Sequence, residues 1–274
     1  MFTLVAGTGY TGHRVLERLP ITEVIGASRS PIETDRPFHL ADFDALNASV
    51  FDLPARYAVL YTCPPGDEND ARLQHFLAHL SPTPARFVYI STTGVYGNCH
   101  GAVVNEDAPL NPDSQMSRPR VAAENLLGEW AGRTGCDLVI LRVPGIYGPG
   151  RLGVERIEQG GAYIASDEAN PGNRIHVDDL ATCCITALSE ETEAGVYNVG
   201  DGDHRTATWF ADEVARQAGL PEPRKISRAQ AEEEFSPARL AFLASSRIVD
   251  TTRMREVLGV TPRAPEEGIR DSLS

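Results

Sequence analysis

The sequence predicts an α/β protein built on a doubly wound parallel sheet, with a small, mainly helical lobe toward the C-terminus. An apolar strand, a glycine-rich turn and a helix follow one another at the N-terminus. Further short apolar runs then alternate with helical patterns as far as residue 200, after which the pattern is mostly helical. Strands that alternate with crossover helices build a parallel sheet. At 274 residues the chain is long enough for one large α/β domain with its own core.

The first unit carries a glycine-rich turn between an apolar strand, residues 2–6, and a helix, residues 13–19. In the spacing G-x-G-x-x-G, Gly7 permits a tight turn, Gly9 lets a pyrophosphate approach the backbone, and Gly12 lets the helix pack closely on the strand. Free N–H groups at the helix N-terminus favour an anion there. This Rossmann-type unit predicts a dinucleotide site, and a plain structural turn is the alternative. The candidate residues are Gly7, Thr8, Gly9, Tyr10, Thr11 and Gly12.

The second strand, residues 23–28, ends in Ser28, Arg29 and Ser30. In NAD-binding units an acidic residue about 20 positions after the turn usually holds the ribose hydroxyls. Here a guanidinium flanked by two hydroxyls suits a 2′-phosphate, because arginine forks onto phosphate oxygens and serines donate hydrogen bonds. The sequence therefore predicts NADP(H), and the alternative is that Arg29 is a solvated surface residue.

Two further strand ends provide cofactor-binding candidates. A brief strand over residues 38–43 ends near Asp42, which can either reach the exocyclic amine of an adenine or cap a turn. A buried strand over residues 57–62 is stopped by a proline-rich segment, and open parallel sheets bind ligands beyond the carboxyl ends of their strands. The candidates at this second strand end are Thr62, Cys63 and Pro64.

The rest of the chain continues the alternation. The spacing of apolar residues predicts helices over 70–80, 119–130, 178–188 and 250–258, and one through 209–218 that Thr206 or Thr208 begins. Strands are predicted over 86–91, 137–143, 174–177 and 196–199. These elements predict a dinucleotide-binding domain at 1–152, to which 174–200 returns, and a substrate lobe made of 153–173 and 201–274.

Composition limits the classes of partner. The 25 basic and 38 acidic side chains give a net charge of −13, which repels nucleic acid and anionic membranes. The sequence has neither a signal-type segment nor an apolar run long enough to span a bilayer, so we expect a cytoplasmic protein. Its five cysteines lack C-x-x-C spacing and predict reduced core thiols, with no disulfide framework and no metal site.

Several stretches together resemble the extended short-chain dehydrogenase/reductase superfamily, which includes NAD(P)-dependent sugar-nucleotide epimerases, dehydratases and reductases. They occur in the family's order from end to end. The matching stretches are residues 7–12, 90–97, 122–124, 141–150 and 175–180.

The resemblance implies roles for particular residues. Thr92 stands where the family has the Ser or Thr that hydrogen-bonds the substrate oxygen; alternatively its hydroxyl bonds the local backbone. Pro144 and Ile146 stand where backbone groups meet the nicotinamide amide. Arg151 is expected near the pocket of a small-molecule substrate or at the surface. Dimers through paired crossover helices are common in the superfamily, so a homodimer is an option here.

The sequence departs from the family at the catalytic pair Tyr-x-x-x-Lys. Aligning residues 121–124 with the family's helix puts Met116 at the Tyr position and Arg120 at the Lys position. A thioether has no proton to give, and arginine can hold a ribose or a phosphate but cannot take part in a proton relay. A different register offers no rescue, because the chain's single lysine, Lys225, follows Pro221 by four positions.

A reductase of this type therefore needs another proton donor, since proton transfer contributes about 10²- to 10⁴-fold. The candidates are Thr92, Ser117, a bound water and Tyr96, which is the phenol among them and alternatively packs in the core. We expect an NADP(H)-dependent reductase or epimerase-like enzyme that acts on a small polar carbonyl or sugar-derived substrate. A non-catalytic NADP(H)-binding module is the alternative. A sugar-nucleotide epimerase is disfavoured by size, because only about 120 residues follow Gly153.

Overall fold

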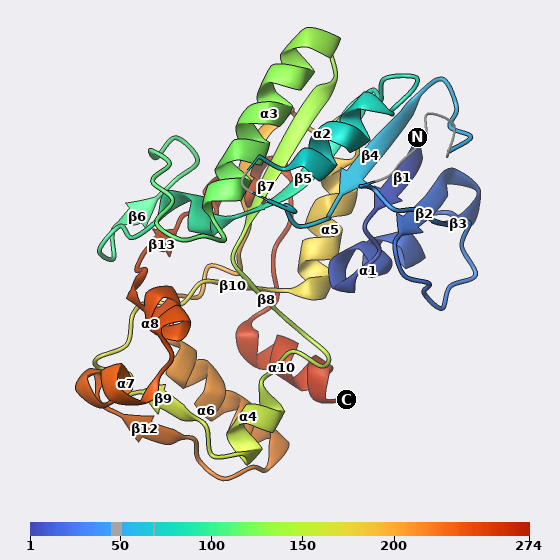
Figure 1. The fold of residues 1–274 in the computed structure, drawn as a ribbon. Coiled ribbons are helices and arrows are strands. Elements are labelled where there is room, and N and C mark those ends of the chain that lie inside the picture. The colour runs from blue at the N-terminus through green and yellow to red at the C-terminus, as the bar shows by residue number, and fades with distance from the viewer. Residues whose placement is uncertain (45–50, 68) are drawn as a thin grey trace.

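A computed structural model describes residues 1–44, 51–67 and 69–274 (Figure 1). Its centre is a seven-stranded sheet in the order β11-β7-β5-β4-β1-β2-β3, and every neighbouring pair is parallel. This confirms the predicted doubly wound fold. The strands are β1 (Phe2–Ala6), β2 (Val24–Ser28), β3 (Phe38–Leu40), β4 (Tyr57–Tyr61), β5 (Arg86–Thr92), β7 (Asp137–Val143) and β11 (Gly195–Asn198).

The register brings the candidate cofactor residues to one edge of this sheet. The last residue of β1, Ala6, pairs with Ala27 of β2 and with Tyr61 of β4. The segments that follow these strands therefore leave the sheet side by side. On the other half of the sheet, β5 and β7 pair from Arg86 to Thr92, so Thr92 lies at the same carboxyl edge.

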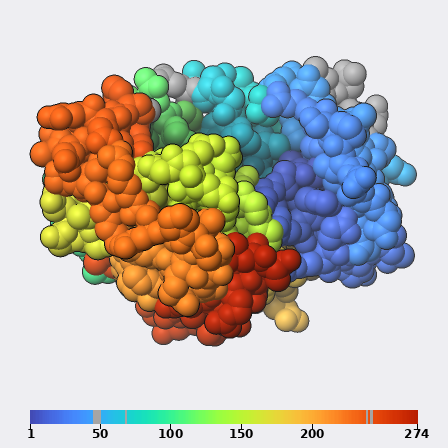
Figure 2. Space-filling model, turned by 90° about the horizontal axis from the view of Figure 1, so that it is seen from below, coloured from blue at the N-terminus to red at the C-terminus, as the bar shows by residue number. Residues whose placement is uncertain are grey.

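Helices cover both faces of the sheet (Figure 1). On one face, α1 (Tyr10–Arg18), α5 (Val177–Ala187) and α9 (Thr252–Val257) bury apolar residues against the strands. On the other face, α2 (Ala71–Ala78) and α3 (Arg118–Thr134) do the same. Figure 2 shows the lobe beside the N-terminal residues, with α10 (Pro265–Leu273, red) between them.

Outside the main sheet, the described residues form a lobe and three pairs of short strands. The lobe contains α4 (Val154–Glu158), α6 (Ala207–Ala218), α7 (Arg228–Glu234) and α8 (Pro237–Ala244). The parallel pairs are β8 (Gly145–Tyr147) with β10 (Arg174–His176), β9 (Ala162–Ile164) with β12 (Arg224–Ile226), and β6 (Val103–Val104) with β13 (Ile248–Val249). Two 3₁₀ turns, η1 (Ile21–Glu23) and η2 (Thr93–Tyr96), complete the connections.

Two sequence predictions are refined by the packing. Thr206 is the cap of α6, because its side chain accepts from the Trp209 amide at 3.1 Å, whereas buried Thr208 bonds the Ile164 carbonyl. The predicted lobe of 201–274 needs a correction at α9. Met254 and Leu258 lie in the same core as Val5 of β1, so this helix returns to the sheet.

None of the helices in the described ranges combines the length and apolar character needed to cross a bilayer. No group of three or more His, Cys, Asp or Glu side chains is arranged for a metal ion in that part of the chain. All five cysteines are described and free, and four of them are buried.

Candidate functional site

The glycine-rich turn has the geometry that a bound pyrophosphate requires. Gly7 adopts a φ of +95°, and a Cβ added to Gly12 would lie 1.9 Å from the Gly7 carbonyl oxygen. A Cβ added to Gly9 would meet nothing within 4 Å, so the space in front of this residue is open. Gly9 is also the N-cap of α1 and makes no side-chain cap, which leaves the first N–H groups of the helix without one. The residues present therefore fit a dinucleotide.

Side chains from neighbouring strand ends support this turn. Thr62 donates to the Gly7 carbonyl at 2.6 Å, and the Cys63 thiol approaches the Ala6 carbonyl at 3.7 Å. Burial raises the pKa of Cys63 to about 12, so it remains a neutral thiol. Thr8 donates to Ser28, which in turn donates to the Ser30 carbonyl. Thr62, Cys63, Thr8 and Ser28 thus lie around the turn, and they hold it in shape.

The end of β2 presents Arg29 to solvent, with 59% of its side chain exposed. Its guanidinium lies 3.8 Å from the carboxylate of Asp44. Asp42 is exposed, and its side chain accepts from the Asp44 amide at 3.1 Å, so the turn-capping alternative is the one observed for its oxygen. Pro64 lies beside this group, because its carbonyl accepts from Arg72 of α2 at 3.4 Å.

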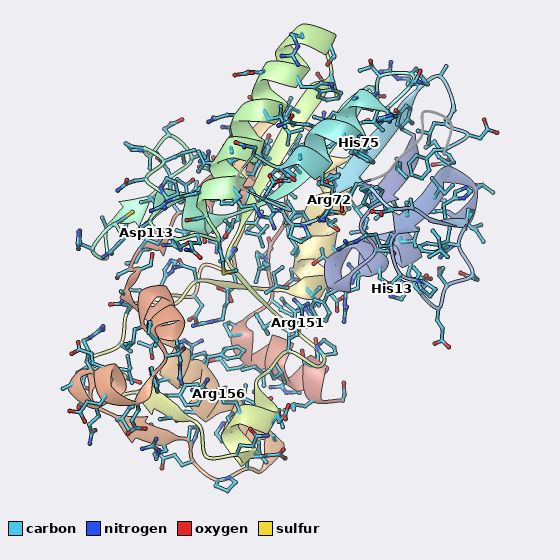
Figure 3. All side chains as sticks on the ribbon, in the orientation of Figure 1. His13, Arg72, His75, Asp113, Arg151 and Arg156 are labelled. Atoms are coloured by element: carbon cyan, nitrogen blue, oxygen red, sulfur yellow. The ribbon has the colours of Figure 1, made fainter. Side chains whose placement is uncertain are left out.

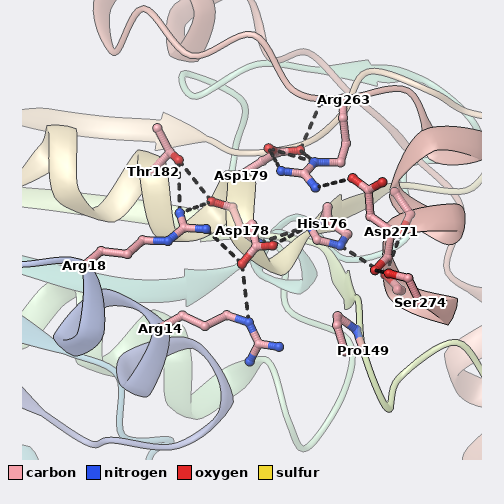
Figure 4. A network of polar contacts seen from close by, with 12 residues as sticks. Arg14, Arg18, Pro149, His176, Asp178, Asp179, Thr182, Arg263, Asp271 and Ser274 are labelled. Carbon is pink, nitrogen blue, oxygen red and sulfur yellow. Dashed lines mark hydrogen bonds and ion pairs between the residues drawn. The ribbon is translucent and has the colours of Figure 1, made fainter. Parts of the chain in front are cut away.

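The segment that leads into the lobe contacts the glycine-rich turn directly. The Tyr10 hydroxyl donates to the Pro149 carbonyl at 3.0 Å. The guanidinium carbons of Arg14 and Arg151 lie 4.2 and 3.9 Å from the Tyr10 ring centroid. Arg14 also pairs with Asp178 at the start of α5, as Figure 4 shows, while Figure 3 places Arg151 between the sheet and the lobe. Arginine is therefore concentrated where phosphates would bind.

Pro144 and Ile146 lie just after the carboxyl end of β7. Pro144 joins β7 to β8, and Ile146 of β8 pairs with Ile175 of β10. Ile146 is partly buried against the main core, which fixes the backbone of this segment. The position suits contact with a ligand beyond the strand ends.

Thr92 ends β5 and caps the η2 turn. Its hydroxyl oxygen accepts from the Gly94 amide at 3.1 Å, so the local backbone bond that the sequence left as an alternative is present. Because a hydroxyl can accept and donate at once, the hydrogen of Thr92 can still reach a substrate. The local backbone bond and a hydrogen bond to a substrate are therefore compatible at Thr92.

The structure corrects the expectation that Tyr96 can serve as the proton donor. Its side chain is 1% exposed, and its hydroxyl donates to Asn198 at 2.6 Å and accepts from Arg142 at 2.9 Å. Burial raises its pKa, which further opposes release of the proton. The core-packing alternative is the one observed.

The residues at the family's catalytic positions lie at the start of α3. Met116 is 84% exposed just before this helix. Arg120, in its first turn, donates to the Ile90 carbonyl at 2.5 Å and to the Tyr89 hydroxyl at 3.1 Å. Buried Ser117 shares a hydrogen bond of 2.8 Å with Ser114, so its hydroxyl is engaged within the turn. Arg120 can hold an anion or a ribose from here, but it provides no acid.

Sequence reasoning missed the pairing of Arg72 with Asp44 and the stacking of Arg14 on Tyr10. The sequence pattern places Arg72 on the polar face of a helix. No local sequence pattern connects it with Asp44, which lies 28 positions earlier. Arg14 follows Tyr10 by four positions on α1, which is a detectable signal for neighbouring side chains on a helix.

Comparisons with known proteins agree with this geometry. Residues 68–200 match the model of the NAD dependent epimerase/dehydratase family. Protein YeeZ of Escherichia coli K12 is 33% identical over 196 residues, which cover 67% of this chain and 64% of YeeZ. UDP-glucose 4-epimerase of Mycolicibacterium smegmatis is 30% identical over 201 residues, which cover 69% of this chain and 61% of the relative. The chain thus covers less than two thirds of the length of either relative.

Two solved structures match over nearly their whole length. A functionally unknown conserved protein from Silicibacter pomeroyi DSS superimposes with a TM-score of 0.82 at 28% identity, covering 99% of this chain and 98% of that one. UDP-glucose 4-epimerase from Thermotoga maritima, solved with UDP-glucose, gives a TM-score of 0.79 at 19% identity, covering 100% and 97%. A fold of this size therefore also occurs in an epimerase, and the size argument against a sugar-nucleotide substrate is wrong.

Proposed function

Because residues 68–200 match the NAD dependent epimerase/dehydratase family model, we propose that the chain belongs to this family and is an NADP(H)-binding oxidoreductase or epimerase-like enzyme. Its substrate is a small polar carbonyl or sugar-derived compound, and its proton donor is not a tyrosine. The observation that carries the proposal is the open space at Gly9, between the tightly packed Gly7 and Gly12 and one strand away from Arg29.

Each group has a separate task in this proposal. Residues 9–12 receive the pyrophosphate, Arg29 with Ser28 and Ser30 receives the 2′-phosphate, and Arg120 holds a ribose or phosphate oxygen. NADP(H), when bound, supplies or accepts a hydride. Thr92 orients the substrate oxygen through its hydroxyl hydrogen. With Tyr96 buried and Ser117 engaged, Thr92 or a water that it holds is the remaining proton donor among the four candidates.

Two other functions have observations in their favour. An exposed Met116 at the family's Tyr position and the buried Tyr96 favour a non-catalytic NADP(H)-binding module. The coverage of the Thermotoga maritima epimerase, 97% of that chain, favours a sugar nucleotide as the substrate.

The test begins with calorimetric titration of the wild type and Arg29→Ala with NADPH and NADH. Charge-assisted hydrogen bonds contribute about 1.5–3 kcal/mol each, so the variant should bind NADPH roughly ten- to a hundredfold more weakly and NADH almost unchanged. Equal losses for both nucleotides would remove the case for NADP(H).

Transfer of tritium from labelled NADPH to a panel of carbonyl and sugar-nucleotide compounds then tests catalysis. Transfer to any compound excludes the binding-module alternative. Tight NADPH binding without transfer to any member of the panel supports it.

A further inference from the structure

Asp44 lies between two arginines beside the predicted 2′-phosphate position. Arg72 binds it with two hydrogen bonds, from Nε to Oδ1 and from Nη2 to Oδ2, both of 2.9 Å. Arg29 approaches the same Oδ2 more loosely, at 3.8 Å. Arg72 is only 13% exposed, whereas Asp44 and Arg29 are 46% and 59% exposed. The carboxylate is thus held by the buried arginine and leaves Arg29 open to solvent.

The group formed by Asp44, Arg29 and Arg72 borders the glycine-rich turn. Asp44 follows β3, whose end pairs with the end of β2, so it faces the segment that carries Arg29. Arg72 begins α2 and reaches back to the Pro64 carbonyl after β4. The positive charges of Arg72 and Arg29 both lower the pKa of the Cys63 thiol against the stronger effect of burial. That thiol lies 2.9 Å from where a Cβ of Gly7 would be, so both guanidinium groups are near the turn.

The charges of these residues determine how they affect the binding of a phosphate. A phosphate monoester carries about −1.5 to −2 charges at neutral pH. A 2′-phosphate on Arg29 would lie close to the Asp44 carboxylate, and the two anions would compete for one guanidinium. Two hydrogen bonds from Arg72 neutralise Asp44 and lower its pKa, which keeps the carboxylate ionised and bound to Arg72. NAD(H) lacks the phosphate, so this competition does not arise for it.

We propose that Arg72 is a specificity-determining residue, which favours NADP(H) over NAD(H) by binding the Asp44 carboxylate more tightly than Arg29 does and so leaving Arg29 available to a phosphate. The inference rests on the proposed function, because it assumes that a 2′-phosphate binds at Arg29. Arg72 acts as a positioning residue: its effect on the phosphate passes through Asp44. This gives the Arg72–Asp44 pair a role in selecting the cofactor.

A double-mutant cycle on the full chain tests this role. The proteins are the wild type, Arg72→Met, Asp44→Asn and the double variant, with Arg56→Met as a control that removes an exposed arginine paired with Glu190. Each is titrated at low salt with four probes. NADPH and 2′,5′-ADP carry the 2′-phosphate, whereas NADH and ADP-ribose lack it. Thermal unfolding monitored by circular dichroism verifies that every variant is folded.

We expect Arg72→Met to weaken NADPH and 2′,5′-ADP about fivefold, because Asp44, without Arg72, pairs more closely with Arg29 and competes with the phosphate. Asp44→Asn should tighten both by a similar factor, and the double variant should match Asp44→Asn within about twofold. NADH and ADP-ribose should change less than about twofold throughout, as should every probe with the control variant.

Three results overturn the inference. Equal weakening of all four probes by Arg72→Met would mean that Arg72 only supports the segment after β4. An undiminished effect of Arg72→Met in the Asp44→Asn background would mean that Arg72 contacts the phosphate itself. If the wild type binds neither NADPH nor ADP-ribose, the proposed function falls together with this inference, and the first two results leave that function standing.

Discussion

Gly12 is the residue on which the geometry of the turn depends most. A methyl group there would lie 1.9 Å from the Gly7 carbonyl, so Gly12→Ala must push α1 away from β1. We expect the free energy of unfolding to fall by about 1–3 kcal/mol and NADPH binding to become undetectable by calorimetry. Urea unfolding followed by circular dichroism measures the first effect.

Gly128 provides the matched control, because it lies in α3 with nothing within 4 Å of an added Cβ. Gly128→Ala should stabilise the protein by about 0.5–1 kcal/mol, since alanine favours the helix. Similar losses in both variants would mean that the close approach at Gly12 is not what matters.

The roles of some residues follow from their spacing in the sequence. The roles of others follow from their burial in the folded protein. The glycine spacing predicted the turn, because each position has its own steric requirement. The sequence could not decide between a reactive and a buried Tyr96, because its partners Asn198 and Arg142 come from strands about a hundred and about fifty residues away. For the same reason, Asp44 was not associated with Arg72.

At the scale of elements, one buried ion pair connects α3 with β7. Arg142 binds Glu124 at 2.8 Å, and both side chains are about 95% buried. Arg142→Met would leave the carboxylate of Glu124 without its cation, which costs about 3–5 kcal/mol. We expect Glu124→Met with Arg142→Met to cost clearly less than the sum of the single losses, as measured by urea unfolding.

An exposed pair on α6 serves for comparison. Arg216→Met removes the pair with Glu213, where 68% of the arginine side chain is exposed, and should leave the free energy of unfolding almost unchanged. Additive losses for Glu124 and Arg142 would show that α3 and β7 are held by apolar packing rather than by their ion pair.

The elements themselves could largely be predicted, but not all of their partners. Strand and helix patterns predicted the seven-stranded sheet because alternation along the chain determines a parallel arrangement. The pattern of α9 is that of any amphipathic helix, and periodicity alone does not say which surface covers it. Its assignment to the lobe failed because Met254 packs into the core of the main sheet, where α9 lies against β11.

At the scale of the whole molecule, Asp201 connects stability with pH. It lies in the loop between β11 and α6, where the sheet meets the lobe. Its buried Oδ2 has no hydrogen-bond partner among the described residues. Burial raises its pKa from 3.8 to about 7, against the opposing effects of the Asp203 amide and Arg174. The folded state therefore binds this proton more tightly than the unfolded state does.

As the pH rises from about 4 to 7, the unfolded state releases this proton while the folded state keeps it, so the contribution of Asp201 to stability falls. Asp201→Asn should remove this loss: we expect a gain of about 1–3 kcal/mol at pH 8 and almost none at pH 4. Urea unfolding at several pH values measures this, with exposed Asp35→Asn as the control. Parallel profiles for the wild type and Asp201→Asn would contradict the assignment.

The return of α9 to the sheet has a consequence for how the protein is made. Val5, near the first residue of the chain, shares one apolar core with Leu258 and Val260, near its end. During synthesis the first strands leave the ribosome long before the helix that covers them, and non-local contacts of this kind close late. A fragment such as 1–152 keeps α1 but lacks both α5 and α9, so it would expose part of one face of the sheet. Part of the apolar cover of the nucleotide-binding half is therefore translated about a hundred residues after that half ends.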